Sequence, residues 1–251
     1  MRRLTMFLAL AGLSVAATLF VAAPANAFSI TTCPVDSGRP YHVWGQQYAS
    51  GNYYGQFGWL TTYNVSVPDP TTAFSLSHLY TYYGASAPFT AYTFIEVGYY
   101  KGEGNSASHD YSAPHYYYTW QTNGTYHETD STSGPASGSS KSYQIEFQGH
   151  NYTLGTDDWT VYWDGVGSAD GTIHQPSMPY GHALAGGEVQ GDSTSYTEMH
   201  TKGTADQQII LSSYTWQNWT TYFTSTTACK SSGVSYTENS NYMAYTATGS
   251  I

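Results

Sequence analysis

The sequence predicts an all-β protein built from two packed antiparallel sheets. No window of about a dozen residues keeps apolar side chains at helical spacing without a Gly, a Pro or a polar break. Short runs in which apolar and polar residues alternate recur instead. Turn-forming pairs such as Asn123-Gly124 and Asp164-Gly165 separate these runs. Many short strands with no alternating helices favour a sandwich of antiparallel sheets.

The first residues have the layout of a secretory signal peptide. Arg2-Arg3 precede an apolar run from Met6 to Ala23, and the small-residue site Ala25-Asn26-Ala27 follows. A membrane anchor is the alternative, but the run is short and no second stretch of about 18 apolar residues follows it. We therefore expect cleavage of residues 1–27, secretion, and no membrane association of residues 28–251.

The expected strands lie at short spacing along the mature chain, with no internal repeat and no linker long enough to divide it. The segment from Ser131 to Ser140 is rich in Gly and Ser and reads as a loop. We therefore expect one domain over residues 28–251. The nine segments with the clearest alternation are Tyr53 to Val67, Ala73 to Tyr83, Tyr92 to Tyr100, His115 to Gln121, Tyr143 to Gln148, Trp159 to Trp163, His182 to Gln190, Gln207 to Tyr214 and Trp219 to Phe223.

The charge balance argues against nucleic acid as a partner. Seven Lys and Arg face seventeen Asp and Glu, a net charge of −10, and removal of Arg2 and Arg3 with the signal makes the mature chain more acidic still. A phosphate backbone would be repelled. The 26 Tyr residues fit a surface that binds neutral polymers or peptides. They equally fit a chain that simply favours strands.

The two cysteines, Cys33 and Cys229, lie near opposite ends of the mature chain. Export to an oxidising compartment favours a disulfide between them. Closing so long a loop removes about 5 kcal/mol of denatured-state entropy in the chain-entropy model. We expect a structural bridge, which also excludes a thiol nucleophile.

The familiar catalytic signatures are missing. The chain contains no Gly-x-Ser-x-Gly, no phosphate-binding Gly-x4-Gly-Lys-Ser/Thr and no His-Glu-x-x-His. His109, Asp110 and His115 cluster in sequence, but a Gly-, Ser- and His-rich turn is a commoner explanation than a metal site. We therefore expect neither metal nor cofactor, and the carboxylates remain as candidates.

Two glutamates lie in otherwise apolar or glycine-rich strands. Side chains alternate along a strand, so Glu96 shares a face with Phe94 and Gly98. Glu188 directly follows Gly186-Gly187, where another backbone can approach closely. A carboxylate among the apolar and glycine residues of a strand is neutralised, paired with an opposite charge or functional, unless its strand lies exposed at the edge of a sheet.

The segments around both glutamates resemble a known family. Phe94 to Tyr100 is similar to the Ile-Glu-x-Gly-Trp segment of the neprosin family of glutamic peptidases, and Ala185 to Val189 is similar to that family's Trp-Gly-Gly-Glu-Val. Ala185 and Tyr99 stand where the family has Trp. Eqolisin peptidases typically carry Gln at the first catalytic position, so Glu96 places the chain nearer neprosin. The resemblance runs from about Gly55 to Phe223, through segments at Tyr116 to Trp120, Tyr143 to Phe147 and Trp159 to Gly165.

The resemblance implies a concanavalin-like β-sandwich, or jelly roll, with Glu96 and Glu188 as catalytic residues facing a groove. It implies a peptide or protein substrate, hydrolysis by an activated water, and greatest activity at acidic pH. Four aromatic residues are candidates to line the groove, although core packing explains each equally well or better: Trp59, Tyr118, Trp120 and Tyr162.

Two other functions fit the same sequence. A jelly-roll glycosidase also sets a glutamate pair across an aromatic groove, although no glycosidase signature surrounds either residue. A non-catalytic secreted module that binds sugar or peptide fits the composition, because one fold hosts many functions.

Overall fold

A computed structural model gives the fold of the chain, which is all-β. The described residues form sixteen strands. They contain no helix, and therefore none that is long and apolar enough to cross a membrane. The signal segment and Cys33 lie outside the described residues, so the signal peptide and the disulfide stay predictions. The structure describes residues 41–48, 54–71, 73–83, 93–103, 111–165, 168–176, 181–191, 197–203, 208–210, 215–218, 222–229, 235–239 and 244–250.

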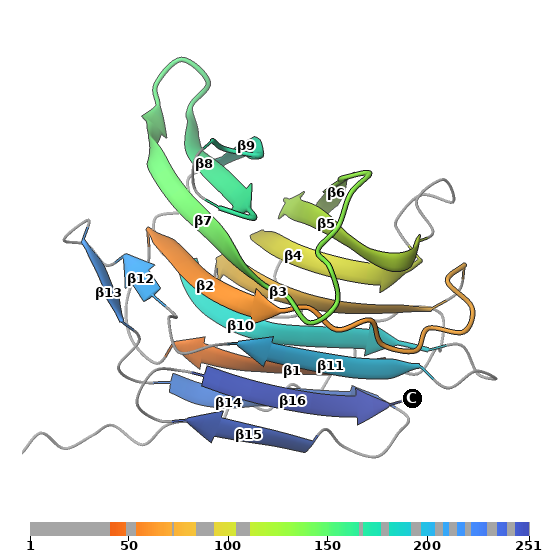
Figure 1. Ribbon diagram of the computed structural model, residues 1–251. Coiled ribbons are helices and arrows are strands. Elements are labelled where there is room, and N and C mark those ends of the chain that lie inside the picture. Colours follow the sequence, from red (N-terminus) through yellow and green to blue (C-terminus); the bar gives the residue numbers. More distant parts are fainter. Residues whose placement is uncertain are drawn as a thin grey trace, which may run out of the picture.

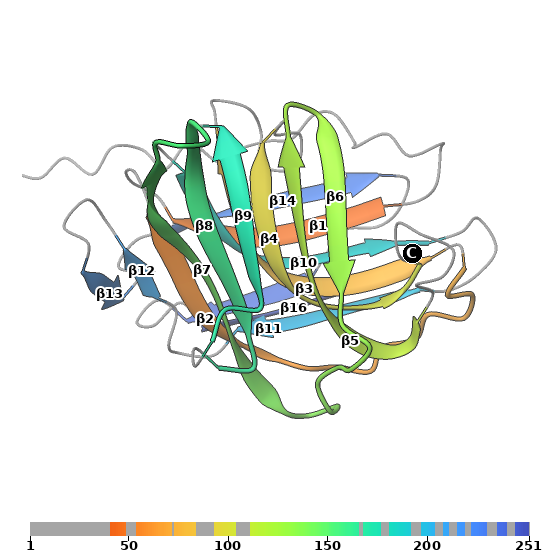
Figure 2. The same cartoon turned by 90° about the horizontal axis from the view of Figure 1, so that it is seen from above.

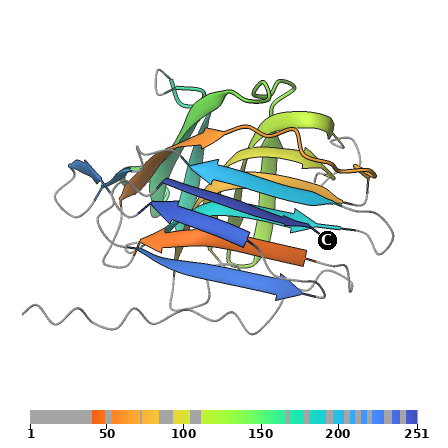
Figure 3. The same cartoon turned by 60° about the horizontal axis from the view of Figure 1, so that its bottom comes forward.

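Seven antiparallel strands form the first sheet (Figure 1). Strand β3 lies inside it, with β10 on one side and β4 on the other. Figure 3, which brings the lower edge forward, shows orange β1 beside blue β14. In spatial order the strands are β14 (Tyr222–Cys229), β1 (Tyr41–Tyr48), β10 (Gly181–Gln190), β3 (Phe74–Tyr83), β4 (Phe94–Gly102), β5 (Tyr111–Thr122) and β6 (Thr125–Asp130).

The second sheet has nine strands, two of which branch off strand β2. Figure 2 shows from above how β7, β8 and β9 form one end of it. The main path is β15 (Ser235–Asn239), β16 (Ala244–Ser250), β11 (Glu198–Gly203), β2 (Gly55–Thr61), β7 (Ser140–Asn151), β8 (Thr156–Trp163) and β9 (Gly171–Pro176); the branch is β12 (Gln208–Ile210) with β13 (Trp216–Asn218).

The predicted turns and loop are confirmed, and one strand boundary is corrected. Asn123 and Gly124 both have positive φ, at 50° and 83°, and join β5 to β6 as a tight hairpin. The segment from Ser131 to Ser140 is a loop up to Ser139. The strand expected to reach Val67 ends at Thr61, because its partner β7 begins at Ser140, opposite Thr61.

The hydrophobic core lies between the two sheets. Alternation places Ile95, Val97 and Tyr99 on the core side of β4, as predicted. The second sheet contributes the largest fully buried side chain, Trp159. The remaining core residues are Leu60, Leu79, Tyr116, Tyr118, Tyr143, Ile145, Val161, Ile173, Ala183, Ala185 and Val189.

Hydrogen bonds across the core attach β3, β4 and β10 to the opposite sheet. Gln56 donates to Thr81 of β3 at 2.8 Å. The hydroxyl of Tyr99, on β4, donates to the Thr61 carbonyl oxygen at 2.8 Å. The hydroxyl of Thr201, on β11, donates to the Gly186 carbonyl oxygen of β10 at 2.9 Å. These three strands are therefore fixed relative to one another by more than their own ladders.

The buried tyrosines predict a loss of stability in alkali. Burial raises the pKa of Tyr99 to about 12, and it also raises the pKa of Tyr117 and Tyr143. An unfolded tyrosine ionises near pH 10, so the unfolded state loses protons first and stability falls as pH rises from about 10 to 12. Tyr99 alone accounts for about 3 kcal/mol over that interval. Denaturant unfolding at stepped pH, followed by tyrosinate absorbance, should show ionisation coinciding with unfolding; ionisation well before unfolding contradicts this.

Candidate active site

Three adjacent strands of the first sheet bring one histidine and two glutamates together. His78 is on β3, Glu96 on β4 and Glu188 on β10. Their neighbours Leu79, Val97 and Val189 point into the core. Since successive side chains alternate, the three ionisable residues lie on the opposite face of the sheet.

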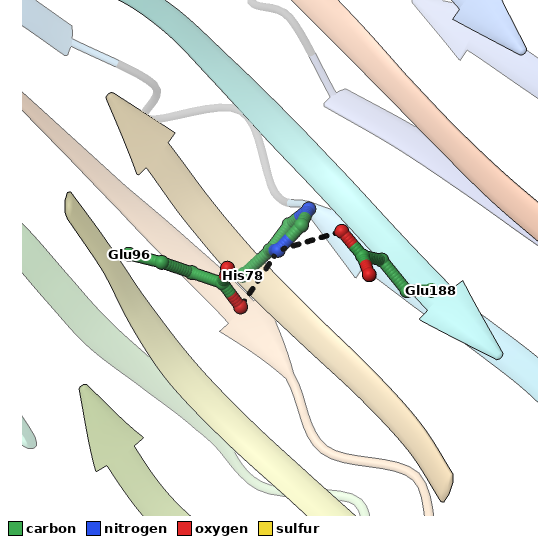
Figure 4. A group of neighbouring side chains, drawn as sticks. All are labelled: His78, Glu96 and Glu188. Atoms are coloured by element: carbon green, nitrogen blue, oxygen red, sulfur yellow. Dashed lines mark ion pairs between the residues drawn. The ribbon is translucent and has the colours of Figure 1, made fainter. Parts of the chain in front are cut away.

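The three side chains point toward one another (Figure 4). His78 Nδ1 lies 3.0 Å from Glu96 Oε1 and 3.9 Å from Glu188 Oε1. One donor atom from each residue lies within 4.8 Å of the other two. The His78 side chain is fully buried, while 8% of Glu96 and 13% of Glu188 is exposed. The two predicted catalytic glutamates thus meet at one imidazole, and a small part of each glutamate side chain is exposed to solvent.

Glycines make room for this arrangement. His78 pairs with Gly98 of β4 on one side and Gly186 of β10 on the other. A Cβ atom at Gly98 would lie 2.0 Å from the Ser77 carbonyl oxygen, a distance that no real side chain tolerates. One at Gly187 would lie 2.8 Å from the Leu76 carbonyl oxygen. The close backbone approach predicted beside Glu188 is therefore confirmed.

A tyrosine from the next strand holds Glu96. The Tyr117 hydroxyl on β5 donates a hydrogen bond to Glu96 Oε1. Burial, and then the negative charge of Glu96, raises the pKa of Tyr117 well above its usual range. Tyr117 therefore stays protonated and remains the donor of this hydrogen bond.

The imidazole is electrostatically coupled to both carboxylates. Burial acts to lower the pKa of His78, but the attraction of Glu96 and Glu188 outweighs it, so the net shift is upward. Protonated His78 would offset part of the negative charge of the pair. In the described part of the chain, His78, Glu96 and Glu188 also form the group whose donor atoms lie close enough to share a metal ion.

An apolar cluster adjoins one end of the site. Tyr80, Phe94 and Leu184 are buried together, and each lies toward the same end of its strand relative to His78, Glu96 and Glu188. Tyr126, which is 39% exposed, has its ring centroid 6.2 Å from that of Phe94. The ionisable cluster thus lies beside apolar side chains on the outer face of the sheet.

The structure does not bring the four predicted groove aromatics to the glutamates. Tyr118 is buried in the core, and Trp120 stacks on it from the same side of β5, with ring centroids 5.7 Å apart. Trp59 and Tyr162 lie on the outer face of the second sheet, because their neighbours Leu60 and Val161 point into the core. The groove prediction for these residues is corrected on this point.

Two residues of the site were not predicted. His78 stands within the expected strand from Ala73 to Tyr83, with no motif around it. Tyr117 stands in a run of aromatics, next to Tyr118, which was chosen instead. Only the strand register places both beside Glu96. Of the sequence cluster considered for metal, His109 and Asp110 lie outside the described residues.

Comparison with known proteins identifies the fold. No protein-family model matches the chain, and no curated protein sequence matches it. Among solved structures, Scytalido-glutamic peptidase with a peptide-based transition-state analogue aligns with a TM-score of 0.54 and 7% identity, over 85% of this chain and 98% of that one. The chain therefore shares the fold of this glutamic peptidase. This confirms the predicted sandwich.

Two further solved structures also match the chain. The same peptidase with a transition-state analogue inhibitor aligns over the same shares of both chains, with a TM-score of 0.53 and 7% identity. A Bacillus licheniformis β-glucanase aligns over 57% of this chain and 56% of its own, with a TM-score of 0.36 and 15% identity. The structural similarity to the peptidase covers most of the chain.

Proposed function

We propose that the chain is a secreted glutamic endopeptidase that hydrolyses peptide bonds with Glu96, Glu188 and a water molecule. The observation that carries the proposal is the convergence of the two glutamates on the outer face of the first sheet. The glutamic-peptidase fold supports it. Secretion through the signal at residues 1–27, and a peptide or protein as the substrate, belong to the same proposal.

The closeness of the carboxyl groups supplies the acid and the base. Two like charges this near one another do not both ionise easily, so one group keeps a proton while the other is ionised. The Tyr117 hydroxyl donates to Glu96 Oε1, and His78 Nδ1 lies nearer to Glu96 than to Glu188. Glu96 is thus the carboxylate that is held as a hydrogen-bond acceptor. Glu96 is therefore assigned as the base, and Glu188 as the acid.

Hydrolysis then needs no covalent enzyme intermediate. Ionised Glu96 takes a proton from water while the water oxygen bonds to the peptide carbonyl carbon. Glu188 donates a hydrogen bond to the carbonyl oxygen as it becomes negatively charged. The C–N bond breaks as a proton passes to the leaving nitrogen, giving a free amine and a carboxylic acid. The pair titrates jointly, so activity is expected at acidic pH.

The test is digestion of an unfolded protein substrate by the purified mature chain. The pH should span about 3 to 7, the range in which coupled carboxylates titrate. Peptide fragments, detected by mass spectrometry, are expected at the acidic end and should fall away toward neutral pH. No cleavage anywhere in the range, with an inhibitory propeptide ruled out, leaves a binding module as the better account. Release of sugars from a glycan panel by the same preparation would instead identify a glycosidase.

A further inference from the structure

We propose that His78, Glu96 and Glu188 bind a divalent cation of the zinc class, and that the bound cation blocks the peptidase. The binding site stands on the geometry alone. The inhibitory effect rests on the proposed function.

The donor set and its spacing suit zinc. Zinc takes imidazole nitrogen and carboxylate oxygen at about 2.0–2.2 Å, so neighbouring ligand atoms in a tetrahedral site lie about 3.3 Å apart. His78 Nδ1 lies 3.0 Å from Glu96 Oε1 and 3.9 Å from Glu188 Oε1. All three donor atoms lie within 4.8 Å of one another, so rotation of the glutamate side chains would bring them around one ion. A fourth position would be left for a water molecule, because part of each glutamate side chain is exposed to solvent.

The histidine is positioned as a ligand. Its side chain is fully buried, and Nδ1 points between the two carboxylates, 3.0 Å from Glu96 Oε1 and 3.9 Å from Glu188 Oε1 (Figure 4). The other ring nitrogen, Nε2, has no hydrogen-bond partner within the described part of the chain. A buried imidazole whose Nδ1 faces two carboxylates can exchange its proton for a metal ion.

The surroundings favour a zinc-like ion over calcium or magnesium. The hydroxyl of Tyr117 already holds Glu96, as outer hydrogen bonds commonly hold metal-binding carboxylates. Calcium and magnesium prefer six or more oxygen ligands, whereas one imidazole with two carboxylates suits zinc and its neighbours. The strand ladders on both sides of β3 fix the three backbones that carry the donors.

Occupation by zinc would stop the proposed chemistry. An oxygen bonded to the cation is no longer free to take a proton from water, and a metal-bound Glu188 carries no proton to give. Both roles would be lost at once. Removal of the ion restores both carboxylates, so the block is reversible.

Isothermal titration of the mature chain with zinc chloride at pH about 7, where protons compete less for the ligands, tests the site. One-to-one binding is expected, with no comparable binding of magnesium or calcium chloride. Glu188→Gln should weaken zinc binding at least about tenfold. His78→Gln should do the same. Because a buried substitution can disturb folding, thermal unfolding accompanies each titration: zinc should raise the midpoint of the wild type but of neither variant.

The matched control is His174→Gln. His174 is 47% exposed on β9 and pairs with Asp158 at 2.6 Å, away from the cluster. This variant should bind zinc as the wild type does. Wild-type zinc binding that His78→Gln and Glu188→Gln leave unchanged, or no binding at all, overturns the site without touching the proposed function.

Assays of peptide hydrolysis distinguish the inhibitory role of zinc from the metal-free mechanism of the proposed peptidase. At the highest pH that still supports activity, zinc should lower turnover and a chelator should restore it. Zinc that binds without lowering turnover overturns the inhibitory role. A chelator that abolishes activity leaves the metal site standing and rejects the metal-free mechanism in its place.

Discussion

Replacing Glu96 by Gln should lower the rate of peptide hydrolysis by about a thousandfold, and Glu188→Gln should do the same. Glutamine keeps the size and much of the hydrogen bonding of glutamate but cannot exchange a proton, and loss of a general acid or base typically costs 10²–10⁴-fold. Steady-state kinetics on a peptide substrate at the acidic optimum measures the effect. Circular dichroism and thermal unfolding should change little.

The double variant and a matched control sharpen this test. Groups that act as one catalytic unit are strongly non-additive, so Glu96→Gln with Glu188→Gln should cost little more than either change alone. Glu146→Gln is the control, because Glu146 lies on β7 of the second sheet, where Gln144 donates to it at 2.7 Å. Full activity in both single glutamate variants would leave the site without a catalytic role.

Trp159→Ala should destabilise the fold by about 3–5 kcal/mol, the usual cost of removing a large aromatic from a packed core. Trp159 is fully buried between the sheets, where its ring centroid lies 5.3 Å from that of Phe147. Denaturant unfolding gives the free energy of unfolding, and the slope should stay close to that of the wild type.

Trp159→Phe is the companion variant. The indole nitrogen of Trp159 has no hydrogen-bond partner in the described part of the chain, so Phe loses volume but no hydrogen bond. Its cost should be less than half that of Ala. Equal losses in the two variants would mean that the core collapses around the smaller side chain, contrary to this expectation.

Where apolar and polar residues alternate clearly, the sequence correctly predicted which side chains face the core. In β4 the order Ile95-Glu96-Val97 separates core from outer face, and the structure agrees. In β5 aromatic residues fill every position from Tyr116 to Tyr118. The alternation of apolar and polar residues that distinguishes the two faces of a strand is therefore absent there. That is why Tyr118 was assigned to the groove while Tyr117 was overlooked.

The pairing register of the strands could not be predicted from the sequence. His78 joins the glutamates only because β3 pairs with β4 and β10 at matching glycines, and those pairings connect distant segments. Several strands were also missed. Strand β6, Thr125–Asp130, has a single aromatic among polar residues, so its β structure comes from pairing with β5 rather than from an apolar face.

The order of the strands has a consequence for biosynthesis. Between β4 and β10 the chain first completes β5 and β6 in one sheet and then β7 to β9 in the other. Glu188 reaches Glu96 only when β10 inserts beside β3, a non-local contact that has to wait for its loop closure. A nascent chain that ends before β10 therefore has no assembled pair, and under the proposed function it is inactive.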